Sequence, residues 1–334
     1  MDLLLYVGMA LGATAIVWIG SGWLERSTEK LSVYYQLPAI VQGAVVAAVG
    51  SSFPELSSTV IATLRHGDFD LGVSAIVGSA IFNILVIPGI SGFMGGRLAT
   101  ERDLVYKDAQ FYITSVAVLL IAFSLAVIYN PLPDRPLVGE MDRWIALGPV
   151  ALYGLYIFLH QQDTMEFEPD EVPGEVNPWR QWGVLVVSLV AIVIGVEGLV
   201  VSAIGLGNVF NTPSFLWGLT VIAAATSLPD AFISVRAAQK GDGTVSIANV
   251  LGSNIFDLLI AVPAGVLIAG TATIDFAVAA PMMGYLTVAT IVLFAMLRTR
   301  LSLSRWESGV LLVLYAIFVG WMVLETAGIT HVVT

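Results

Sequence analysis

The sequence has no cysteine and little charge. Of its 334 residues, 12% are charged, which is about half of the roughly 25% that soluble domains carry. The absence of cysteine excludes disulfides and thiolate chemistry. The three histidines are far apart in the chain and have no cysteine beside them, so a zinc or copper centre is disfavoured.

Apolar residues dominate instead. They make up 57% of the chain, and the mean hydropathy is +0.88. A helix needs about 20 apolar residues to cross the hydrocarbon of a bilayer, and runs of that kind fill most of the sequence. We therefore expect a polytopic membrane protein that lies in the lipid bilayer, with no nucleic-acid partner, no obligate protein partner and no bound cofactor.

The apolar runs predict an all-α membrane protein with ten transmembrane helices. The opening run, MDLLLYVGMALGATAIVWIGSGWL, has an acidic leader and is long enough to span, so we expect a first helix rather than a cleaved signal peptide. The expected spans lie near residues 3–24, 37–64, 70–96, 109–129, 143–160, 181–204, 213–238, 245–269, 276–297 and 307–326.

The chain repeats itself. GSSFPE at residues 50–55 matches ATSLPD at 225–230 with an offset of 175, and VGSAIFN at 77–83 matches LGSNIFD at 251–257 with an offset of 174. Each half has five spans, so the second copy enters from the opposite side. We therefore expect two inverted repeats with a site between them at the midplane. The expected units are residues 1–160, an acidic linker at 161–179, and residues 180–334.

The distribution of basic residues predicts the orientation. With the N-terminus outside, eleven Lys and Arg residues fall in inner loops and three in outer loops. Both termini are then extracellular, the linker 161–179 is cytoplasmic, and the expected location is the cell membrane.

Two prolines interrupt the apolar runs beside carboxylates. Proline donates no N–H, so Pro54 frees the carbonyl of Gly50 and Pro229 that of Ala225. A free carbonyl cannot face lipid, but it can face an ion. Nearby backbone oxygens that we expect to be available belong to Ala48, Ser51, Ala223 and Thr226.

Hydroxyls precede carboxylates or amides by four residues in each of four helices, and residues at that spacing share a helix face. All of these groups offer oxygen, which favours hard cations such as Ca²⁺, with its roughly 6–8 oxygen ligands. The glycines before the last two pairs, Gly78 and Gly252, would permit close backbone approach. The pairs are Ser51 and Glu55, Thr226 and Asp230, Ser79 and Asn83, and Ser253 and Asp257.

Three carboxylates lie inside apolar runs: Glu55, Asp230 and Asp257. They indicate function, because burying a charged side chain in the membrane is expensive. Serine and threonine here can also serve as polar contacts between helices. Glu197 is a fourth acid in an apolar run, but Gly22 stands at the matching position of the first half, so we expect a structural or pathway-lining role for Glu197.

The two repeated segments resemble the alpha repeats of the cation/calcium exchanger superfamily. The segment AAVGSSFPELSSTVIATLRHGDFDLGVSAIVGSAIFNIL lies within an alpha-1 motif at 43–85, and AAATSLPDAFISVRAAQKGDGTVSIANVLGSNIFDLL within an alpha-2 motif at 218–260. The resemblance implies Na⁺/Ca²⁺ exchange by alternating access, with Glu55 and Asp230 holding Ca²⁺ and helping to bind Na⁺. It implies further oxygens from Ser51, Ser52, Ser79, Thr226, Ser227 and Ser253, and from the carbonyls of Ala48 and Ala223.

The match of GSAIFN with GSNIFD looks most like the K⁺-dependent branch, in which the aspartate matching Asp257 is tied to K⁺. Asp230 stands where many prokaryotic members have glutamate, and Ala80 where many have asparagine. Asn83 and Asp257 complete the expected ligand set.

Other functions remain open from the residues. A carboxylate cluster also carries protons, so H⁺/Ca²⁺ exchange is an alternative to Na⁺ or K⁺ dependence, and a passive channel would show conductance without a counter-ion. Asp230 and Asp257 could be imagined as an intramembrane aspartyl protease pair, but that class resembles YD plus GxGD, and neither motif occurs in the spans. We expect a transporter rather than an enzyme.

Overall fold

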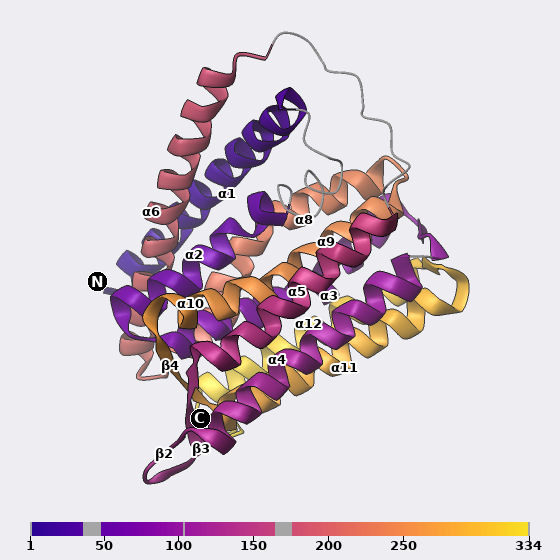
Figure 1. Cartoon of the computed structure of the whole chain (residues 1–334). Coiled ribbons are helices and arrows are strands. Elements are labelled where there is room, and N and C mark those ends of the chain that lie inside the picture. The colour runs from indigo at the N-terminus through magenta and orange to yellow at the C-terminus, as the bar shows by residue number, and fades with distance from the viewer. Residues whose placement is uncertain (1, 36–47, 103, 164–175, 333–334) are drawn as a thin grey trace.

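The computed structural model describes residues 2–35, 48–102, 104–163 and 176–332 (Figure 1). This part of the chain forms ten helical segments, three of which contain a π-helical turn, labelled η. The segments are α1 (Asp2–Tyr34), α2 (Ala48–His66), α3 (Phe69–Gly95), η2 (Leu104–Asp108) with α4 (Ala109–Tyr129), α5 (Arg143–Asp163), α6 (Pro178–Phe210), α7 (Ser214–Trp217) with η3 (Gly218–Ile222) and α8 (Ala223–Gln239), α9 (Gly243–Phe256) with η4 (Asp257–Ala261) and α10 (Val262–Ala269), α11 (Phe276–Arg300), and α12 (Arg305–Thr326).

Eight of the described segments are long and apolar enough to cross a membrane. The two others are α5, which is a shorter apolar helix over Arg143–Leu159, and α2, whose described 19 residues carry Glu55, six serines and threonines, and a basic end. The chain is therefore an all-helical membrane protein.

Several expected span boundaries were wrong. The first helix runs to Tyr34 rather than to residue 24, because LERSTEK continues the helix although it is polar. The sixth covers Pro178–Phe210 rather than 181–204, and it is capped by Asn177, whose side chain accepts a hydrogen bond from the Arg180 N–H. The beginning of the second expected span, at 37–47, and most of the acidic linker 161–179 lie outside the described residues.

Short strands, which the apolar pattern did not predict, join loops at each end of the bundle. At one end β1 (Leu98–Ala99) pairs with β5 (Ser302–Leu303). At the other, β3 (Arg135–Asp142) pairs with both β2 (Pro131–Leu132) and β4 (Thr271–Asp275). An even number of helical segments separates β1 from β5, and likewise β3 from β4. A chain that crosses the bundle with each segment returns to the same end after an even number of crossings, so the paired loops lie at the same end.

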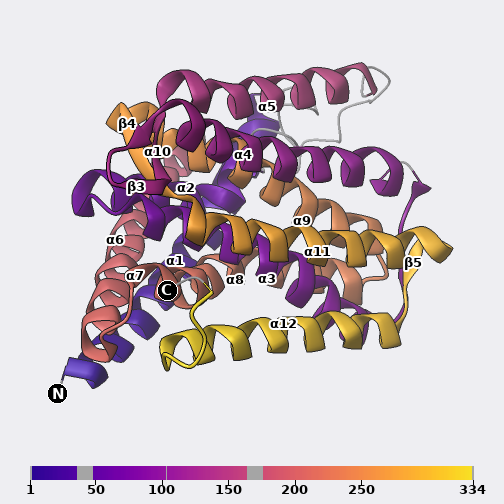
Figure 2. The ribbon, with the colours of Figure 1, turned by 90° about the horizontal axis from the view of Figure 1, so that it is seen from below.

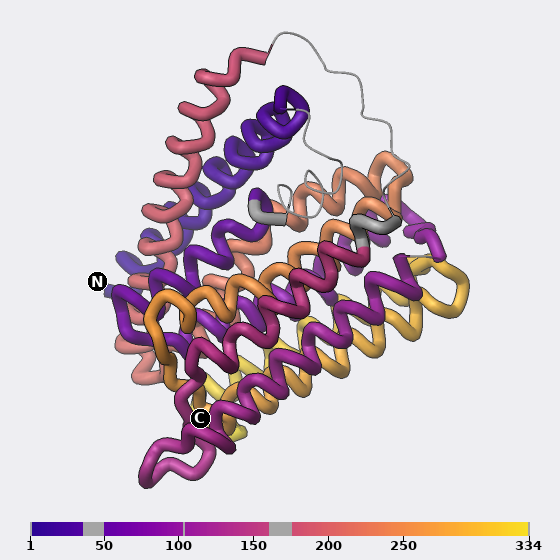
Figure 3. The backbone as a smooth tube through the Cα atoms, in the orientation of Figure 1, coloured from indigo at the N-terminus to yellow at the C-terminus, as the bar shows by residue number. Residues whose placement is uncertain are grey.

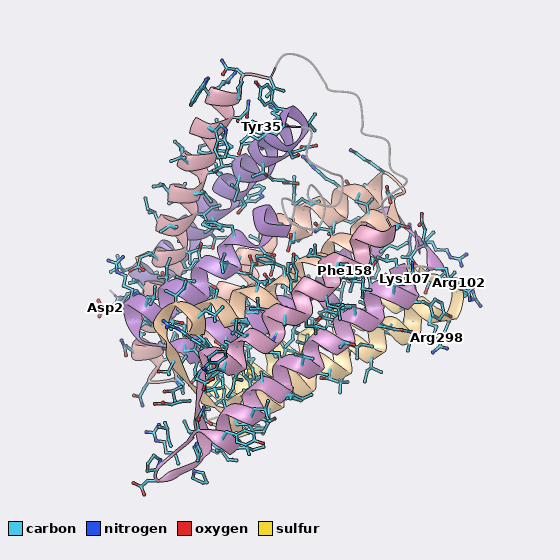
Figure 4. The ribbon with its side chains drawn as sticks, in the orientation of Figure 1. Asp2, Tyr35, Arg102, Lys107, Phe158 and Arg298 are labelled. Atoms are coloured by element: carbon cyan, nitrogen blue, oxygen red, sulfur yellow. The ribbon has the colours of Figure 1, made fainter. Side chains whose placement is uncertain are left out.

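The ends of the bundle differ in charge. Figure 4 places Asp2 at one end, and Arg102, Lys107 and Arg298 at the opposite end. The guanidinium groups of Arg102 and Arg298 both lie over the ring of Tyr106, at 5.5 and 5.6 Å from its centroid. The marks for both chain ends lie on the side of β2 to β4, away from β5 (Figures 1 and 2).

The helices form two apolar cores. The larger core joins α3, α4, α9, α10, α11 and α12, and the smaller joins α1 and α6 to α2, α3 and η3. α1 and α6 pack along each other and stand at an angle to the remaining helices (Figure 3). α3 is buried along most of its length and contacts α2, α8 and α9, and those three helices also contact one another. This four-helix junction holds the repeated motifs.

Candidate functional site

The two carboxylates of the repeated proline motifs are buried in the junction. Glu55 on α2 and Asp230 on α8 are each 1% exposed. Both helices run without interruption through Pro54 and Pro229. The local sequence explains how the carboxylates are placed: each follows a hydroxyl by one turn, so Ser51 and Glu55 share one face of α2.

Glu55 is held by serines from both halves of the chain. The Ser79 hydroxyl on α3 donates to Glu55 Oε1 at 3.3 Å, and Ser227 Oγ on α8 lies 2.7 Å from Ser79 Oγ. Because a hydroxyl has a single hydrogen to donate, Ser227 must donate to Ser79. Thr226 also lies beside the Glu55 carboxylate. Glu55 Oε2 is buried and has no hydrogen-bond partner among the described residues.

Asp230 has matching neighbours. Ser253 on α9 and Ser51 on α2 lie beside its carboxylate. The Asn249 amide is 3.5 Å from Asp230 Oδ1 and 3.1 Å from Ser234 Oγ. Asp230 Oδ2 is buried without a hydrogen-bond partner in the described part of the chain.

The two halves therefore surround their carboxylates in the same way. Glu55 meets Thr226 of the other half, and Asp230 meets Ser51, which is the residue equivalent to Thr226 at the offset of 175. Likewise Ser79 and Ser253 are equivalent at the offset of 174. This pseudo-twofold arrangement brings the expected residues of both motifs into one place.

Asp257 is a third carboxylate in the junction, close enough to Glu55 and Asp230 for their charges to repel. It begins the π-helical segment η4, whereas its counterpart Asn83 lies inside the regular helix α3, and both are fully buried. A π-helical turn inside a helix is frequent at functional sites. Ser52 faces Asp257, but the geometry falls short of a hydrogen bond. The buried oxygens that have no hydrogen-bond partner among the described residues include Ser52 Oγ, Asn83 Oδ1, and Asp257 Oδ1 and Oδ2.

The expected backbone ligands are less defined. The Ala223 carbonyl, at the first position of α8, lies 3.4 Å from Thr226 Oγ1, which also donates to the Ile222 carbonyl at 3.1 Å. η3 ends directly before Ala223, so the irregular backbone of this half precedes the proline. Ala48 begins α2, and the chain before it lies outside the described residues.

Close backbone approach occurs at one of the two expected glycines. A Cβ on Gly78 would lie 2.2 Å from the Leu219 carbonyl oxygen of η3, so α3 and η3 touch there. A Cβ on Gly252 would meet nothing within 4 Å in the described structure. The expectation was right for Gly78 and found no support at Gly252.

Sequence reasoning missed two amides of α9, the half-buried Asn249 and the buried Asn254. Asn249 and Asn254 both lie within the quoted second motif, but Ala75 and Ala80 stand at their first-half positions, so the repeat gave no signal for them. Asn254 connects Asn83 with Tyr112 on α4.

A cavity of about 1140 Å³ approaches the junction from the end of the bundle that contains β1 and β5. It lies between α1 and α8 and extends to Pro229, the residue before Asp230. Glu25 of α1 lines it and is close enough to Asp230 for their charges to repel. The lining combines tryptophans with charges of both signs: Trp18, Trp23, Glu25, Arg26, Glu29, Arg236 and Lys240.

At the opposite end of the bundle, α2 and α6 are joined. Glu197 Oε1 lies 3.3 Å from Arg65 Nη1, and both Glu197 oxygens lie 3.3 Å from His66 Nε2. The expected structural role of Glu197 thus has a geometric basis, since the carboxylate connects two helices.

The oxygen donors of the junction do not form a compact cluster of acidic side chains. Among the described residues, no three Asp, Glu or His side chains gather as a single metal-binding cluster. The donors are instead carboxylate, hydroxyl and amide oxygens from four helices, which is the mixture that hard cations take.

Comparisons with known proteins agree with this architecture. The family described as "Sodium/calcium exchanger protein" matches residues 5–160 and 180–324. An uncharacterised membrane protein of Methanocaldococcus jannaschii is 25% identical over 318 residues, covering 94% of this chain and 97% of the relative. The sodium/calcium exchanger MaX1 of Methanosarcina acetivorans is 24% identical over 330 residues, covering 90% and 93%.

Two further likenesses differ in extent. Sodium/potassium/calcium exchanger 4 of Mus musculus is 38% identical over 147 residues, which is 43% of this chain and 21% of that protein. A structure of the sodium-calcium exchanger NCX_Mj, soaked with 100 mM Na⁺ and 10 mM Sr²⁺, has a TM-score of 0.63 at 21% identity and covers 95% of this chain and 98% of its own. That likeness shows a shared fold. With the family match extending over most of its length, the chain belongs to the sodium/calcium exchanger protein family.

Proposed function

We propose that this protein exchanges Na⁺ for Ca²⁺ across the membrane by alternating access at the four-helix junction. The observation that carries the proposal is the pair Glu55 and Asp230, one from each half, each buried with an oxygen that no described residue bonds. An unpaired carboxylate in such a place is expensive to keep unless it serves a ligand. Two such charges match the charge of Ca²⁺.

The remaining oxygens divide between two cations in this proposal. Glu55 and Asp230 hold Ca²⁺, with help from the surrounding hydroxyls and from the carbonyls of Ala48 and Ala223. Asp257 and Asn83, together with Ser52, hold a monovalent cation beside that pair. The hydroxyls assigned to the Ca²⁺ position are those of Ser51, Ser79, Thr226, Ser227 and Ser253.

Alternating access follows from two inverted repeats of five spans, which we propose for the ten segments. The cavity beside Pro229 gives the junction an approach from one end, while Glu197, Arg65 and His66 connect α2 with α6 at the other. We interpret the structure as the inward-facing state, with the β1–β5 end in the cytoplasm and both termini outside.

K⁺ dependence is a second candidate that two observations favour. The segment GSNIFD ends in Asp257, and the mouse relative that is 38% identical over 147 residues is named a sodium/potassium/calcium exchanger. H⁺/Ca²⁺ exchange is a further alternative, since carboxylates carry protons as well as metal ions.

The test is flux in proteoliposomes. Uptake of ⁴⁵Ca²⁺ is measured with an outward Na⁺ gradient alone, with a pH gradient alone, and with the Na⁺ gradient in the presence and absence of K⁺. We expect the Na⁺ gradient to suffice. Uptake driven only by the pH gradient would replace Na⁺ by H⁺ in the proposal, and Ca²⁺ permeation without any counter-ion would indicate a channel and overturn it.

A further inference from the structure

A buried amide pair connects the two halves beside the proposed monovalent site. Asn83 Nδ2 on α3 donates to Asn254 Oδ1 on α9 at 2.9 Å. Asn254 Nδ2 in turn lies 3.3 Å from the Ala80 carbonyl oxygen and 3.2 Å from the Tyr112 hydroxyl. Both asparagines are fully buried, as is Tyr112.

We propose that Asn254 is a positioning residue, which turns the Asn83 amide so that its oxygen, and not its NH₂, is offered to a cation. This inference rests on the function proposed above. It assigns a role to a residue that is not itself expected to touch an ion.

The orientation follows from donor and acceptor chemistry. The Ala80 carbonyl can only accept, so Asn254 must direct its NH₂ to Ala80 and its oxygen to Asn83. Asn83 must then direct its NH₂ to Asn254. The single remaining polar atom of that side chain, Asn83 Oδ1, is buried and has no hydrogen-bond partner among the described residues. Rotating either amide by 180° would place two oxygens, or two NH₂ groups, against each other.

The pseudo-twofold relation between the halves supports the same conclusion. At the offset of 174, Asp257 is the counterpart of Asn83, and Ala80 is the counterpart of Asn254. A carboxylate has two equivalent oxygens and needs no partner to choose between them, whereas an amide has one oxygen and one NH₂. The chain therefore has an orienting asparagine opposite the amide and an alanine opposite the carboxylate.

The test uses a double-mutant cycle with purified protein in detergent. Thermal stabilisation is titrated separately with Na⁺, K⁺ and Ca²⁺ for the wild type, Asn83→Ala, Asn254→Ala and the double variant. Because loss of a residue that orients a metal ligand weakens metal affinity about 10–100-fold, we expect Asn254→Ala to raise the half-stabilising monovalent concentration at least about tenfold. The double variant should show no larger shift than Asn83→Ala alone.

Ser115→Ala is the matched control, because Ser115 is a fully buried serine on α4 whose hydroxyl bonds only within its helix, to the Phe111 carbonyl. Its cation response should equal that of the wild type. If Asn254→Ala is not monodisperse, Tyr112→Phe replaces it in the cycle, and since one anchor of Asn254 remains, its shift should be about threefold.

The outcomes separate the two proposals. A wild type that none of the three cations stabilises overturns the proposed function. If cations stabilise the wild type, and the Asn254→Ala protein needs the same cation concentrations for half-stabilisation, the positioning role alone is overturned. The positioning role is also overturned if the shifts of the two single variants in half-stabilising cation concentration add up in the double variant. A purely structural effect of Asn254 would not depend on Asn83.

Discussion

The hydroxyls of Ser79 and Ser227 lie 2.7 Å apart and connect the two halves of the chain directly beside Glu55. This contact orders the hydrogens in the junction, since Ser227 donates to Ser79 and Ser79 to Glu55. One oxygen of Glu55 is thereby bonded, while the other remains available. We therefore expect the negative charge of Glu55, more than its size, to matter for cation binding.

Replacing that charge tests the central site. Glu55→Gln keeps the size and an oxygen but leaves a divalent cation with half of its charge compensation, so we expect Na⁺-driven ⁴⁵Ca²⁺ uptake to fall to near background. Asp230→Asn should have the same effect, because the two halves contribute equivalently. Both proteins should still insert and fold, since burying a neutral amide costs less than burying a charge.

The control for this comparison is Glu325→Gln. Glu325 is a buried carboxylate at the end of α12, and its Oε1 accepts hydrogen bonds from Trp321 Nε1 and the Val332 N–H, which an amide oxygen can also accept. Its uptake should stay near that of the wild type. A Glu55→Gln protein that exchanges Ca²⁺ at a rate close to wild type, at matched amounts of monodisperse protein, would show that the proposed Ca²⁺ position is wrong.

Asp257 should behave differently from Glu55. Both of its oxygens are unbonded among the described residues, but it stands at the start of η4, and its counterpart in the other half is the neutral Asn83. We expect Asp257→Asn to change the dependence of transport on Na⁺ or K⁺ by more than it changes the Ca²⁺ concentration for half-maximal uptake. The measurement varies one cation at a time. Equal losses in both would remove the proposed division between the two positions.

Gly78 and Gly252 are a matched pair for stability, because they occupy equivalent positions in the two motifs. Gly78→Ala would place a Cβ 2.2 Å from the Leu219 carbonyl oxygen, so α3 and η3 would have to separate. Overpacking of this kind costs about 1–3 kcal/mol. Gly252→Ala meets nothing within 4 Å and should be neutral or stabilising by up to about 1 kcal/mol, because alanine favours a helix.

Thermal unfolding in detergent, followed by the loss of monodisperse protein, measures both variants. We expect Gly78→Ala to unfold at a lower temperature than the wild type and Gly252→Ala at the same or a higher one. If the order is reversed, the close contact between α3 and η3 is not present in the folded protein.

The site residues that could be predicted from the sequence are those repeated in both halves of the chain. Glu55, Asp230, Ser79 and Ser253 each have a counterpart in the other half, and the structure brings them together as the motifs indicated. Asn254 has no polar counterpart, and its role arises only from packing of α9 against α3 and α4, which no periodicity in a single segment reveals.

The limits of the fold prediction have a similar cause. Hydropathy marks the apolar part of a helix, but α1 continues through LERSTEK because helix formation does not require apolar residues. The strands β1 and β5 are two residues each and pair across about 200 positions of sequence, so no local pattern announces them. The π-helical segments η3 and η4 likewise have no simple signature in composition.

The last prediction concerns orientation in the membrane. The count of eleven basic residues in the expected inner loops against three in the outer loops predicts that the loop after α8 is cytoplasmic and the loop between β2 and β3 is outside. Three helical segments separate these loops, so they should lie on opposite sides. Gly174, in the acidic linker, would report the inner side, but it lies outside the described residues. Pro133 and Gln239 are described and exposed, and the native chain has no cysteine to interfere.

We therefore expect an impermeant thiol reagent added to intact cells to label Pro133→Cys and to leave Gln239→Cys unlabelled until the membrane is permeabilised. Retained Na⁺-driven uptake by both variants is the control for correct folding. The reverse labelling pattern would invert the orientation and with it the cytoplasmic assignment of the cavity beside Pro229. Labelling of both cysteines from one side would contradict the odd number of crossings between them, and the arrangement of two five-span repeats would then fail.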